Sequence, residues 1–544
     1  MSKTDNLHDF LQDIGDAIKY KKGIADVSIN AQDFSDHIKT IDVGGAVNGV
    51  PDENKDVRFY DYDGTLLYSY TLDEVRRLEK LPTLPGHVGL LGQGWNWDYE
   101  DVIALDRPMN IGANYITDDG KTRLYLNIRT WSEHTGTLVF NQDKANGVTV
   151  DWGDGSPTET FDKLYGYVNA THTYTEDGKY MITLLPDDDC NMFIGSTGPG
   201  VFNATGTVNS DKIFSQNLYK VELGKNIVNR LHVNMLWYCW CVETITIPNN
   251  ITQIKLESTS AKCIVLPKNL DKEIGINAYC LAGKFDVVCI PNGVTSIPPG
   301  CFNSSWPINL TYPNSIKTIE SSCANNYEIK KIVIPDDVKI LPKNLFQNCF
   351  NLSEIKFPDG LRSLSEACLS GVSSLQYIEV PDGVVEIPRS AFYRAIYSNR
   401  SGTNYIKLSP NIEIIDYSGL AQNDIRFLVL PKRLKTLGYS AISDCTLLTN
   451  LVFPSTLETI GAYTFGNNTM VTNYDFTACN NIPTLSDVNA FTNIAADCEI
   501  RVPSDLYDDW ISSDNWSNFT KYIKSYPRTE YDYEALMNKY YGNN

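Results

Sequence analysis

The chain has 544 residues, too many for one compact core, so its length predicts about three or four domains. Its 66 acidic side chains outnumber the 46 basic ones and give a net charge of −20, which disfavours nucleic acid and other polyanions as partners. No apolar run of about 18 residues occurs and the N-terminus MSKTDNLHDF opens with charges, so we expect no signal peptide, lipid anchor or membrane insertion.

Residues 1–45 are predicted to form two short amphipathic helices that attach the protein to a partner. Apolar side chains recur at helical spacing from Leu7 onward, and Asn30 is a suitable cap for the second helix. Two short helices cannot bury their apolar faces alone, so they must pack on each other, on sister copies or on a docking partner, and we favour the last two. The residues expected to form this anchor are Leu7, Phe10, Leu11, Ile14, Ile18, Phe34 and Ile38.

Residues 46–111 are predicted to fold as a small β module. Two alternating runs in FYDYDGTLLYSYT flank Asp63-Gly64, a dipeptide that suits a tight hairpin turn, and a helical patch, LDEVRRLEK, follows. The F-x-D-x-D-G hairpin and the later Gly-Trp pair resemble the internalin-type β-grasp repeat, which implies a β-grasp-like fold. Trp95 and Trp97 alternate, so we expect one to face the core and the other solvent, with core filling favoured over sugar stacking.

Residues 112–198 are predicted to form short strands separated by turns. The run VTVDWGDGS, followed by THTY and DGKYMITL, resembles polycystic-kidney-disease-type immunoglobulin-like domains. That resemblance implies a β-sandwich that acts as a spacer or binding module without catalytic groups. Asp151 and Asp154 are then expected to shape a turn, and the alternative is a calcium role shared with Asp187–Asp189. The stretch GSTGPGVFNATGTVNS is expected to link this module to the next.

Residues 205–502 are predicted to form a solenoid. A hydrophobic-x-hydrophobic-Pro phrase returns from Pro248 to Pro454 with a period of about 22 residues, as in IVIP, IKFP and LVFP. The longer pattern L-x-x-I-x-F-P-x-x-L-x-x-L resembles the BspA-type leucine-rich repeat. Residues 503–544, with Trp510 and Trp516, resemble the helical cap that closes such arrays.

The middle residues of the repeat strands are expected to face outward, because side chains alternate along a strand. This row carries less charge than an ordinary solvated face. One interpretation is that another chain or domain covers it, and the other is that β-branched residues simply favour strands. The row consists of Thr246, Val265, Cys289, Thr311, Val333, Lys356, Glu379, Lys407, Val429 and Val452.

A marked insertion, FYRAIYSNRSGTNY, lies between Pro381 and Pro410. An aromatic and basic loop on a rigid acidic scaffold is typical of a contact hot spot, and the alternative is a solvated loop without function. The aromatic tail YPRTEYDYEALMNKYYGNN is expected to dock on a neighbour. The candidate receptor or partner contacts are Tyr393, Arg394, Tyr397, Arg400 and Tyr405.

Catalytic chemistry finds little support in the sequence. The six histidines show no metal-ligand spacing, and no nucleophile, phosphate-loop or dinucleotide motif occurs. Several cysteines occupy apolar repeat positions and are expected to be buried small hydrophobes. We therefore expect no enzyme activity, no cofactor and no metal site.

The expected fold class is multidomain and mainly β: short N-terminal helices, a β-grasp-like module, an Ig-like β-sandwich, and a BspA-type leucine-rich-repeat solenoid with a helical C-terminal cap. The opening DNLHDFLQDIGDAIKYKKG with INAQDFSDHI is similar to the attachment segment of tail-fibre and related virion proteins of phages that infect gut bacteria.

That similarity implies a non-enzymatic virion structural protein of the tail fibre, collar or baseplate, made in the host cytoplasm. It would be homo-oligomeric, bind other virion proteins through its N-terminal helices, and contact a host-surface glycan or protein or assembly partners through its repeats. The alternative is a bacterial cell-surface adhesin of the BspA type, whose weakness is the missing export signal.

Overall fold

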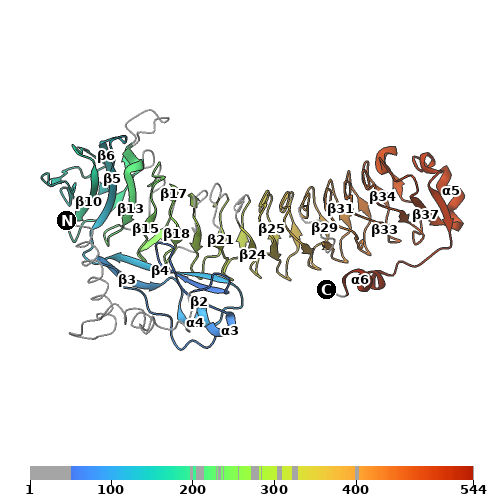
Figure 1. Ribbon diagram of the computed structural model, residues 1–544, viewed down its shortest axis with the longest axis horizontal. Helices are drawn as coiled ribbons and strands as arrows, with labels where there is room; N and C mark the ends of the chain where they lie inside the picture. Colours follow the sequence, from blue (N-terminus) through green and yellow to red (C-terminus); the bar gives the residue numbers. More distant parts are fainter. Residues whose placement is uncertain are drawn as a thin grey trace, which may run out of the picture.

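The computed structural model describes residues 51–542 apart from 196–199, 204–213, 228, 231–234, 237, 255, 271–280, 284, 300, 303–308, 322–328 and 398–403. The expected helices of residues 1–45 and their anchor residues therefore lie outside the described residues. The described chain is elongated: a long solenoid has a pair of sheets at its beginning and a small β module along its flank (Figure 1).

The small module contains a four-stranded sheet in the order β2-β1-β4-β3, in which β1 and β4 are parallel. As predicted, the β1–β2 hairpin turns at Gly64, which has a φ of 90°. The predicted boundary at 111 falls inside β4, and the predicted helical patch is shorter than its sequence pattern. The elements are β1 (Val57–Tyr60), β2 (Leu66–Tyr70), α3 (Leu72–Val75), β3 (Leu90–Trp95), α4 (Tyr99–Ile103) and β4 (Met109–Thr117). We call these elements the β1–β4 module.

The next segment forms two sheets, one ordered β15-β13-β5-β10-β7-β8 and the other β11-β6-β12, with β9 also paired to β6. The sheets share a core that contains Leu126, Phe140 and Trp152. Part of GSTGPGVFNATGTVNS, which was expected to be a linker, forms the strand β12. The strands are β5 (Thr122–Ile128), β6 (Thr135–Gln142), β7 (Val148–Asp151), β8 (Glu159–Thr160), β9 (Val168–Thr173), β10 (Gly178–Pro186), β11 (Met192–Ile194), β12 (Phe202–Asn203) and β13 (Leu218–Glu222).

The two sheets continue directly into the solenoid. β13 pairs antiparallel with β5 and parallel with β15, the first repeat strand. One hydrophobic core extends without interruption from Leu124 to Ile523. The open edge of the first repeat strand is therefore paired by the chain itself, which removes a template for aggregation.

Most repeat strands of the solenoid end two residues before a proline, as β26 ends at Lys356 and β28 at Glu379. Proline cannot donate to a strand ladder, and its carbonyl begins a turn: Leu361 N donates to Pro358 O at 3.0 Å and Val384 N to Pro381 O at 3.1 Å. Parallel pairing of these strands forms one side of the solenoid, which we call the strand face. It contains β15 (Thr244–Thr246), β18 (Cys263–Val265), β20 (Val287–Cys289), β22 (Asn309–Leu310), β24 (Lys331–Val333), β26 (Glu354–Lys356), β28 (Tyr377–Glu379), β30 (Tyr405–Lys407), β33 (Asn450–Val452), β35 (Asn473–Asp475) and β37 (Glu499–Pro503).

A second set of short strands lies on another side of the solenoid and also pairs in parallel, as in the run β29-β31-β32-β34-β36. These strands are β14 (Asn229–Arg230), β16 (Ile251–Gln253), β21 (Ser296–Ile297), β23 (Thr318–Ile319), β25 (Ile340–Leu341), β27 (Ser363–Leu364), β29 (Glu386–Ile387), β31 (Ile414–Ile415), β32 (Thr436–Leu437), β34 (Thr459–Ile460) and β36 (Thr484–Leu485). A separate parallel pair is formed by β17 (Leu256–Thr259) and β19 (Leu281–Gly283).

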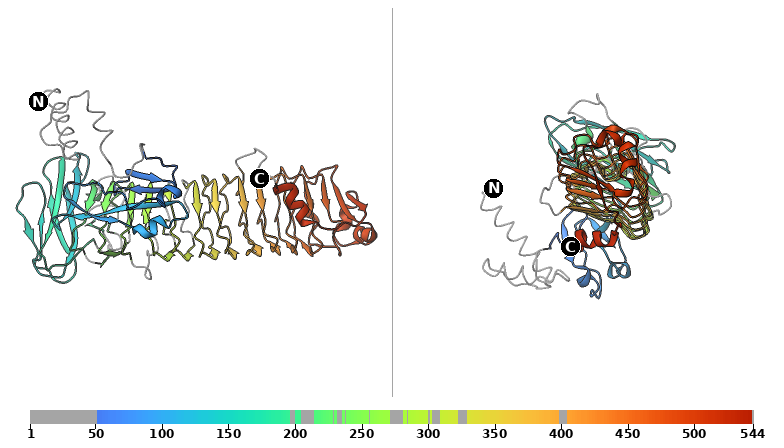
Figure 2. Two further views of the ribbon diagram at one scale, coloured as in Figure 1. Left: turned by 90° about the horizontal axis from the view of Figure 1, so that it is seen from below. Right: turned by 90° about the vertical axis from the view of Figure 1, so that its right-hand side faces the viewer.

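The far end of the solenoid is closed by α5 (Tyr507–Ser512), two 3-10 turns (Ser504–Leu506 and Trp516–Phe519) and β38 (Ile523–Tyr526), which extends the sheet of β37. Beyond β38 the chain turns back, and α6 (Tyr533–Tyr541) lies on the same side of the solenoid as the β1–β4 module (Figure 2). Within the described residues, no helix has the length and apolar character needed to cross a membrane.

Candidate binding surface

The β1–β4 module covers the first part of the strand face. Tyr60 and Leu66 of the module pack against Val265 and Cys289 of the solenoid. Thr246, Val265, Cys289 and Thr311, the first residues of the outward row, are consequently buried. The interpretation that another domain covers this row is thus confirmed for its beginning, and the covering domain belongs to the same chain.

Hydrogen bonds fix the register of the module on the solenoid. Asn96 Nδ2 donates to Leu266 O at 3.2 Å and to Cys289 O at 3.0 Å, while its Oδ1 accepts from Gly112 N. Gly112 permits the close approach, because a Cβ there would lie 2.5 Å from both γ-carbons of Val265. Trp97 Nε1 donates to Ile290 O at 2.9 Å.

The prediction that one of the two tryptophans faces solvent is wrong, since Trp95 and Trp97 are both buried. Trp95 fills the core of the module, and its Nε1 donates to Pro82 O at 2.8 Å. Trp97 belongs to the same apolar cluster of the module, because residues two apart in an extended segment point to the same side, and its indole nitrogen reaches the solenoid.

The C-terminal tail covers the far part of the strand face. Tyr541 Oη donates to Ile406 O at 2.8 Å and Tyr533 Oη to Leu408 O at 3.4 Å, while Tyr531 Oη donates to Leu430 O. Tyr540 stacks on Phe427 with ring centroids 4.9 Å apart. The tail was expected to dock on a neighbour, but in the described structure its docking surface is the chain's own solenoid.

The tail also supplies hydrogen bonds where one repeat segment lacks strand pairing. Residues 427–430 have no strand pairing, although their apolar pattern matches the other repeats. The Tyr541 hydroxyl lies between this segment and β30, since Val429 N donates to it at 3.5 Å. A phenol thus satisfies backbone groups that would otherwise be buried without partners.

Tail docking should weaken at high pH. Burial raises the pKa of Tyr533 to about 12 and raises the pKa values of Tyr531 and Tyr541 as well, whereas an unfolded tyrosine ionises near pH 10. The fold favours the neutral phenol, so this contribution is complete below pH 10 and is lost as the pH rises from 10 to 12. The full chain and the Tyr533→Phe variant are titrated with base, and their phenolate absorbances are subtracted. The difference, which reports Tyr533 alone, should appear near pH 12. A difference centred near pH 10 would contradict the docked arrangement.

Between the two covered parts, a group of polar and aromatic side chains remains exposed. We call Lys331, Glu354, Lys356, Tyr377 and Glu379 the central strand surface; all five are exposed. Lys331 Nζ pairs with Glu354 at 2.7 Å. The preceding outward residue, Thr311, and the later Val429 are both buried, so the surface is bounded at each end by the chain's own modules.

Tyr405 connects the predicted contact loop to this surface. Its ring stacks on Tyr377 with centroids 5.6 Å apart, and its hydroxyl donates to Glu379 at 3.1 Å. Burial, with Glu379 as a further cause, raises the pKa of Tyr405 to about 12. The phenol therefore stays neutral and remains a hydrogen-bond donor at physiological pH.

The other predicted contact residues lie outside the strands. Tyr397 is exposed beneath the Arg394 guanidinium, which lies 4.3 Å from the ring centroid. Tyr393 is half-buried and donates to Gln422 at 2.8 Å. Arg400 is outside the described residues. The candidate contact residues therefore included Tyr405, which borders the central strand surface, and omitted Tyr377 and Glu379. The outward row had already placed Lys356 and Glu379 on this face, and its periodicity could have located Tyr377 as well.

The other predicted sites have local structural roles. Asp151 accepts from Gly153 N at 2.9 Å and Asp154 from Ser156 N at 3.0 Å, as expected for turn formation. The suggested calcium partners are engaged elsewhere: Lys144 binds Asp187 at 2.9 Å and Asp189 at 2.8 Å. No group of three possible metal ligands occurs in the part of the chain that the structure describes. Cysteines such as Cys301 and Cys445 are buried, as predicted.

A solenoid of short parallel strands that recur in each repeat, with apolar interior residues and turns between the strands, defines a protein of the leucine-rich-repeat class. A family model for the BspA type leucine rich repeat region matches residues 202–269, 272–399 and 394–496, together more than half of the chain. The chain belongs to this BspA-type family.

Several solved structures are similar to this chain. A leucine-rich repeat protein from Bacteroides ovatus is 17% identical, with 57% of this chain and 84% of that chain covered and a TM-score of 0.37. A leucine rich cell surface protein from Faecalibacterium prausnitzii is 16% identical, with 63% and 94% covered and a TM-score of 0.31. A leucine-rich repeat protein from Eubacterium ventriosum is 16% identical, with 51% and 83% covered and a TM-score of 0.34. The comparison with curated proteins gave no match. The family assignment therefore rests on the repeat sequence.

Proposed function

We propose that this protein is a non-enzymatic binding protein of the BspA adhesin type, which contacts a glycan or protein on a cell surface through the central strand surface. The observation that carries the proposal is the exposure of this surface between two parts of the strand face that the chain covers itself. The family match supports the adhesin interpretation, because that interpretation was based on the BspA-type repeat.

The chemistry of the central strand surface supports recognition. Self-coverage buries Val265, Cys289 and Val429 and leaves Val333 half-buried, so the exposed side chains are mainly charges of both signs and the Tyr377–Tyr405 pair. Tyrosine is enriched at the centres of binding interfaces, where it supplies a large contact area at low entropic cost. Paired strands hold these side chains in fixed positions, which reduces the ordering cost of binding.

The test is a charge reversal in one repeat. Glu379→Lys places a second cation opposite Lys407 and removes the acceptor for Tyr405 Oη, so binding should weaken about ten-fold or more. Fluorescently labelled protein, applied to a panel of epithelial and bacterial cells, would be measured by flow cytometry.

The matched control is Glu386→Lys, an exposed glutamate of the same repeat that lies on β29 in the second strand set. Its net charge change is the same, so it should bind as the unmodified protein does. Equal loss in both variants would indicate a general charge effect and contradict the proposal. Unchanged binding by Glu379→Lys, or no binding to any cell type, would also contradict it.

The finer assignments of the modules are proposals of the same kind. The order β2-β1-β4-β3 with a central parallel pair supports a β-grasp-like fold for the β1–β4 module, and the two sheets that share Trp152 support an Ig-like sandwich after it. The buried Trp510 and Trp516 support a helical cap within 503–544. Homo-oligomerisation and a virion role remain proposals from the sequence of residues 1–45, and the family match favours the adhesin alternative.

A further inference from the structure

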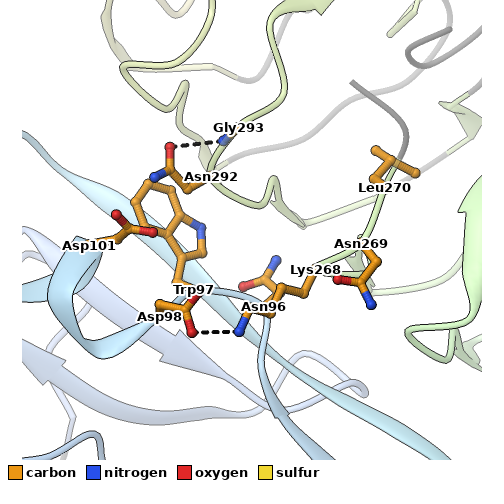
Figure 3. A pocket seen from close by; sticks show the side chains of 9 residues that line it. All are labelled: Asn96, Trp97, Asp98, Asp101, Lys268, Asn269, Leu270, Asn292 and Gly293. Atoms are coloured by element: carbon orange, nitrogen blue, oxygen red, sulfur yellow. Dashed lines mark hydrogen bonds and ion pairs between the residues drawn. The ribbon is translucent and has the colours of Figure 1, made fainter. Parts of the chain in front are cut away.

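A polar cleft of about 450 Å³ lies where the β1–β4 module meets the solenoid. One wall is the segment between β3 and α4, and the opposite wall consists of the turns that follow Pro267 and Pro291 (Figure 3). Its volume falls within the range of about 300–1,000 Å³ that is typical of small-molecule sites. The cleft is lined by Asn96, Trp97, Asp98, Asp101, Lys268, Asn269, Leu270, Asn292 and Gly293.

The walls are held rigidly, so the cleft does not depend on ligand for its shape. Asn96 and Trp97 are buried, and their side chains donate hydrogen bonds to backbone carbonyls of the solenoid. Lys268 Nζ spans the cleft mouth to Asp98 at 2.5 Å. On the far side, Asn292 Oδ1 accepts from Gly293 N at 2.9 Å, which orients its amide.

Several polar atoms remain available for a ligand. Within the described residues, the half-buried Asp101 carboxylate takes part in no hydrogen bond or ion pair, and the Asn292 Nδ2 donor has no partner. The Asn269 side-chain nitrogen donates to Asn249 O at 3.3 Å, which leaves the side-chain oxygen of Asn269 free to accept a hydrogen bond from a ligand. The cleft thus presents acceptors and a donor at close intervals from opposite walls.

This pattern suits neighbouring hydroxyl groups, because each hydroxyl both donates and accepts. Trp97 and Leu270 add a small apolar contribution, which suits the C–H groups of a sugar ring. Two carboxylates against one ammonium disfavour an anionic ligand, and the chain's net charge of −20 acts in the same direction.

We propose that this cleft binds one or two neutral sugar rings of a glycan. Asp101 and Asn269 accept hydrogen bonds from ring hydroxyls, Asn292 donates to one, and Lys268 together with Asp98 closes the mouth of the cleft. The site is separate from the central strand surface and does not rest on the proposed adhesin function.

The labelled full-length chain should retain neutral glycans on an array that also contains sialylated and amine-bearing glycans. The dissociation constant of the strongest neutral glycan is then measured by calorimetry. Asp101→Asn and Asn292→Ala should each weaken it about ten- to hundred-fold, the effect of losing one hydrogen bond that involves a polar or charged partner.

Asp359→Asn is the matched control, because Pro358-Asp359-Gly360 repeats the turn of Pro291-Asn292-Gly293 and Asp359 is exposed. It should bind like the unmodified chain, as should Glu379→Lys, which alters the central strand surface. The assignment is overturned if no neutral glycan binds, if only sialylated or amine-bearing glycans bind, or if both cleft variants retain full affinity.

Discussion

Replacing Trp516 with alanine is expected to destabilise the C-terminal end of the solenoid by about 3–5 kcal/mol, the cost of removing a large aromatic side chain from a packed core. Trp516 is 1% exposed and packs against Phe476 and Trp510. Its loss uncovers the last turns, so the region from β35 to β38 should become sensitive to protease and its unfolding midpoint, followed by circular dichroism, should fall. An unchanged midpoint and protease pattern would contradict this.

Phenylalanine variants provide a matched comparison within the cap. Trp516 Nε1 donates to Pro483 O at 2.8 Å, whereas the Trp510 Nε1 has no partner among the described residues. Both changes remove the same atoms, but only Trp516→Phe leaves a buried carbonyl without its donor, which costs about 1–3 kcal/mol. Trp516→Phe should therefore be less stable than Trp510→Phe, and the reverse order would show that the hydrogen bond has no structural importance.

Deletion of residues 527–544 is expected to have the second largest effect. It uncovers Val429 and Leu408, which are 3% and 2% exposed, and removes the aromatic contacts of Tyr533, Tyr540 and Tyr541. Burial of two aromatic side chains alone contributes at least about 3 kcal/mol. The truncated chain should bind a hydrophobic dye and unfold at lower denaturant concentration, while the β1–β4 module remains docked.

Two point variants separate docking by hydroxyl groups from docking by ring contacts. Tyr541→Phe loses the hydrogen bond to Ile406 O within the break of the strand ladder. Tyr540→Phe loses only a 3.4 Å contact with Asn450 Nδ2. Tyr541→Phe should therefore destabilise the tail more than Tyr540→Phe, as hydrogen exchange of the tail amides would measure. Equal exchange in the two variants would contradict the bridging role of Tyr541.

The repeat architecture could be predicted because its causes are local. Alternation of apolar side chains selects strands, proline ends each one, and a period of about 22 residues forces neighbouring copies to stack. Local patterns also predicted the hairpin at Asp63-Gly64 and the turn carboxylates Asp151 and Asp154. The same patterns overestimated the helix after β2 and placed a domain boundary inside β4, because helix and strand ends depend on tertiary contacts.

The sequence by itself determined that the outward row of the strand face is unusually apolar, and it could only pose the question of what covers that row. The tertiary structure decided the answer. Asn96 binds Cys289, 193 residues away, and Tyr541 binds Ile406, 135 residues away. Contacts at such separations depend on the assembled shape of the solenoid and leave no periodic signal in the chain. Within the described residues they cover both ends of the row and leave Lys331, Glu354, Lys356, Tyr377 and Glu379 exposed between them.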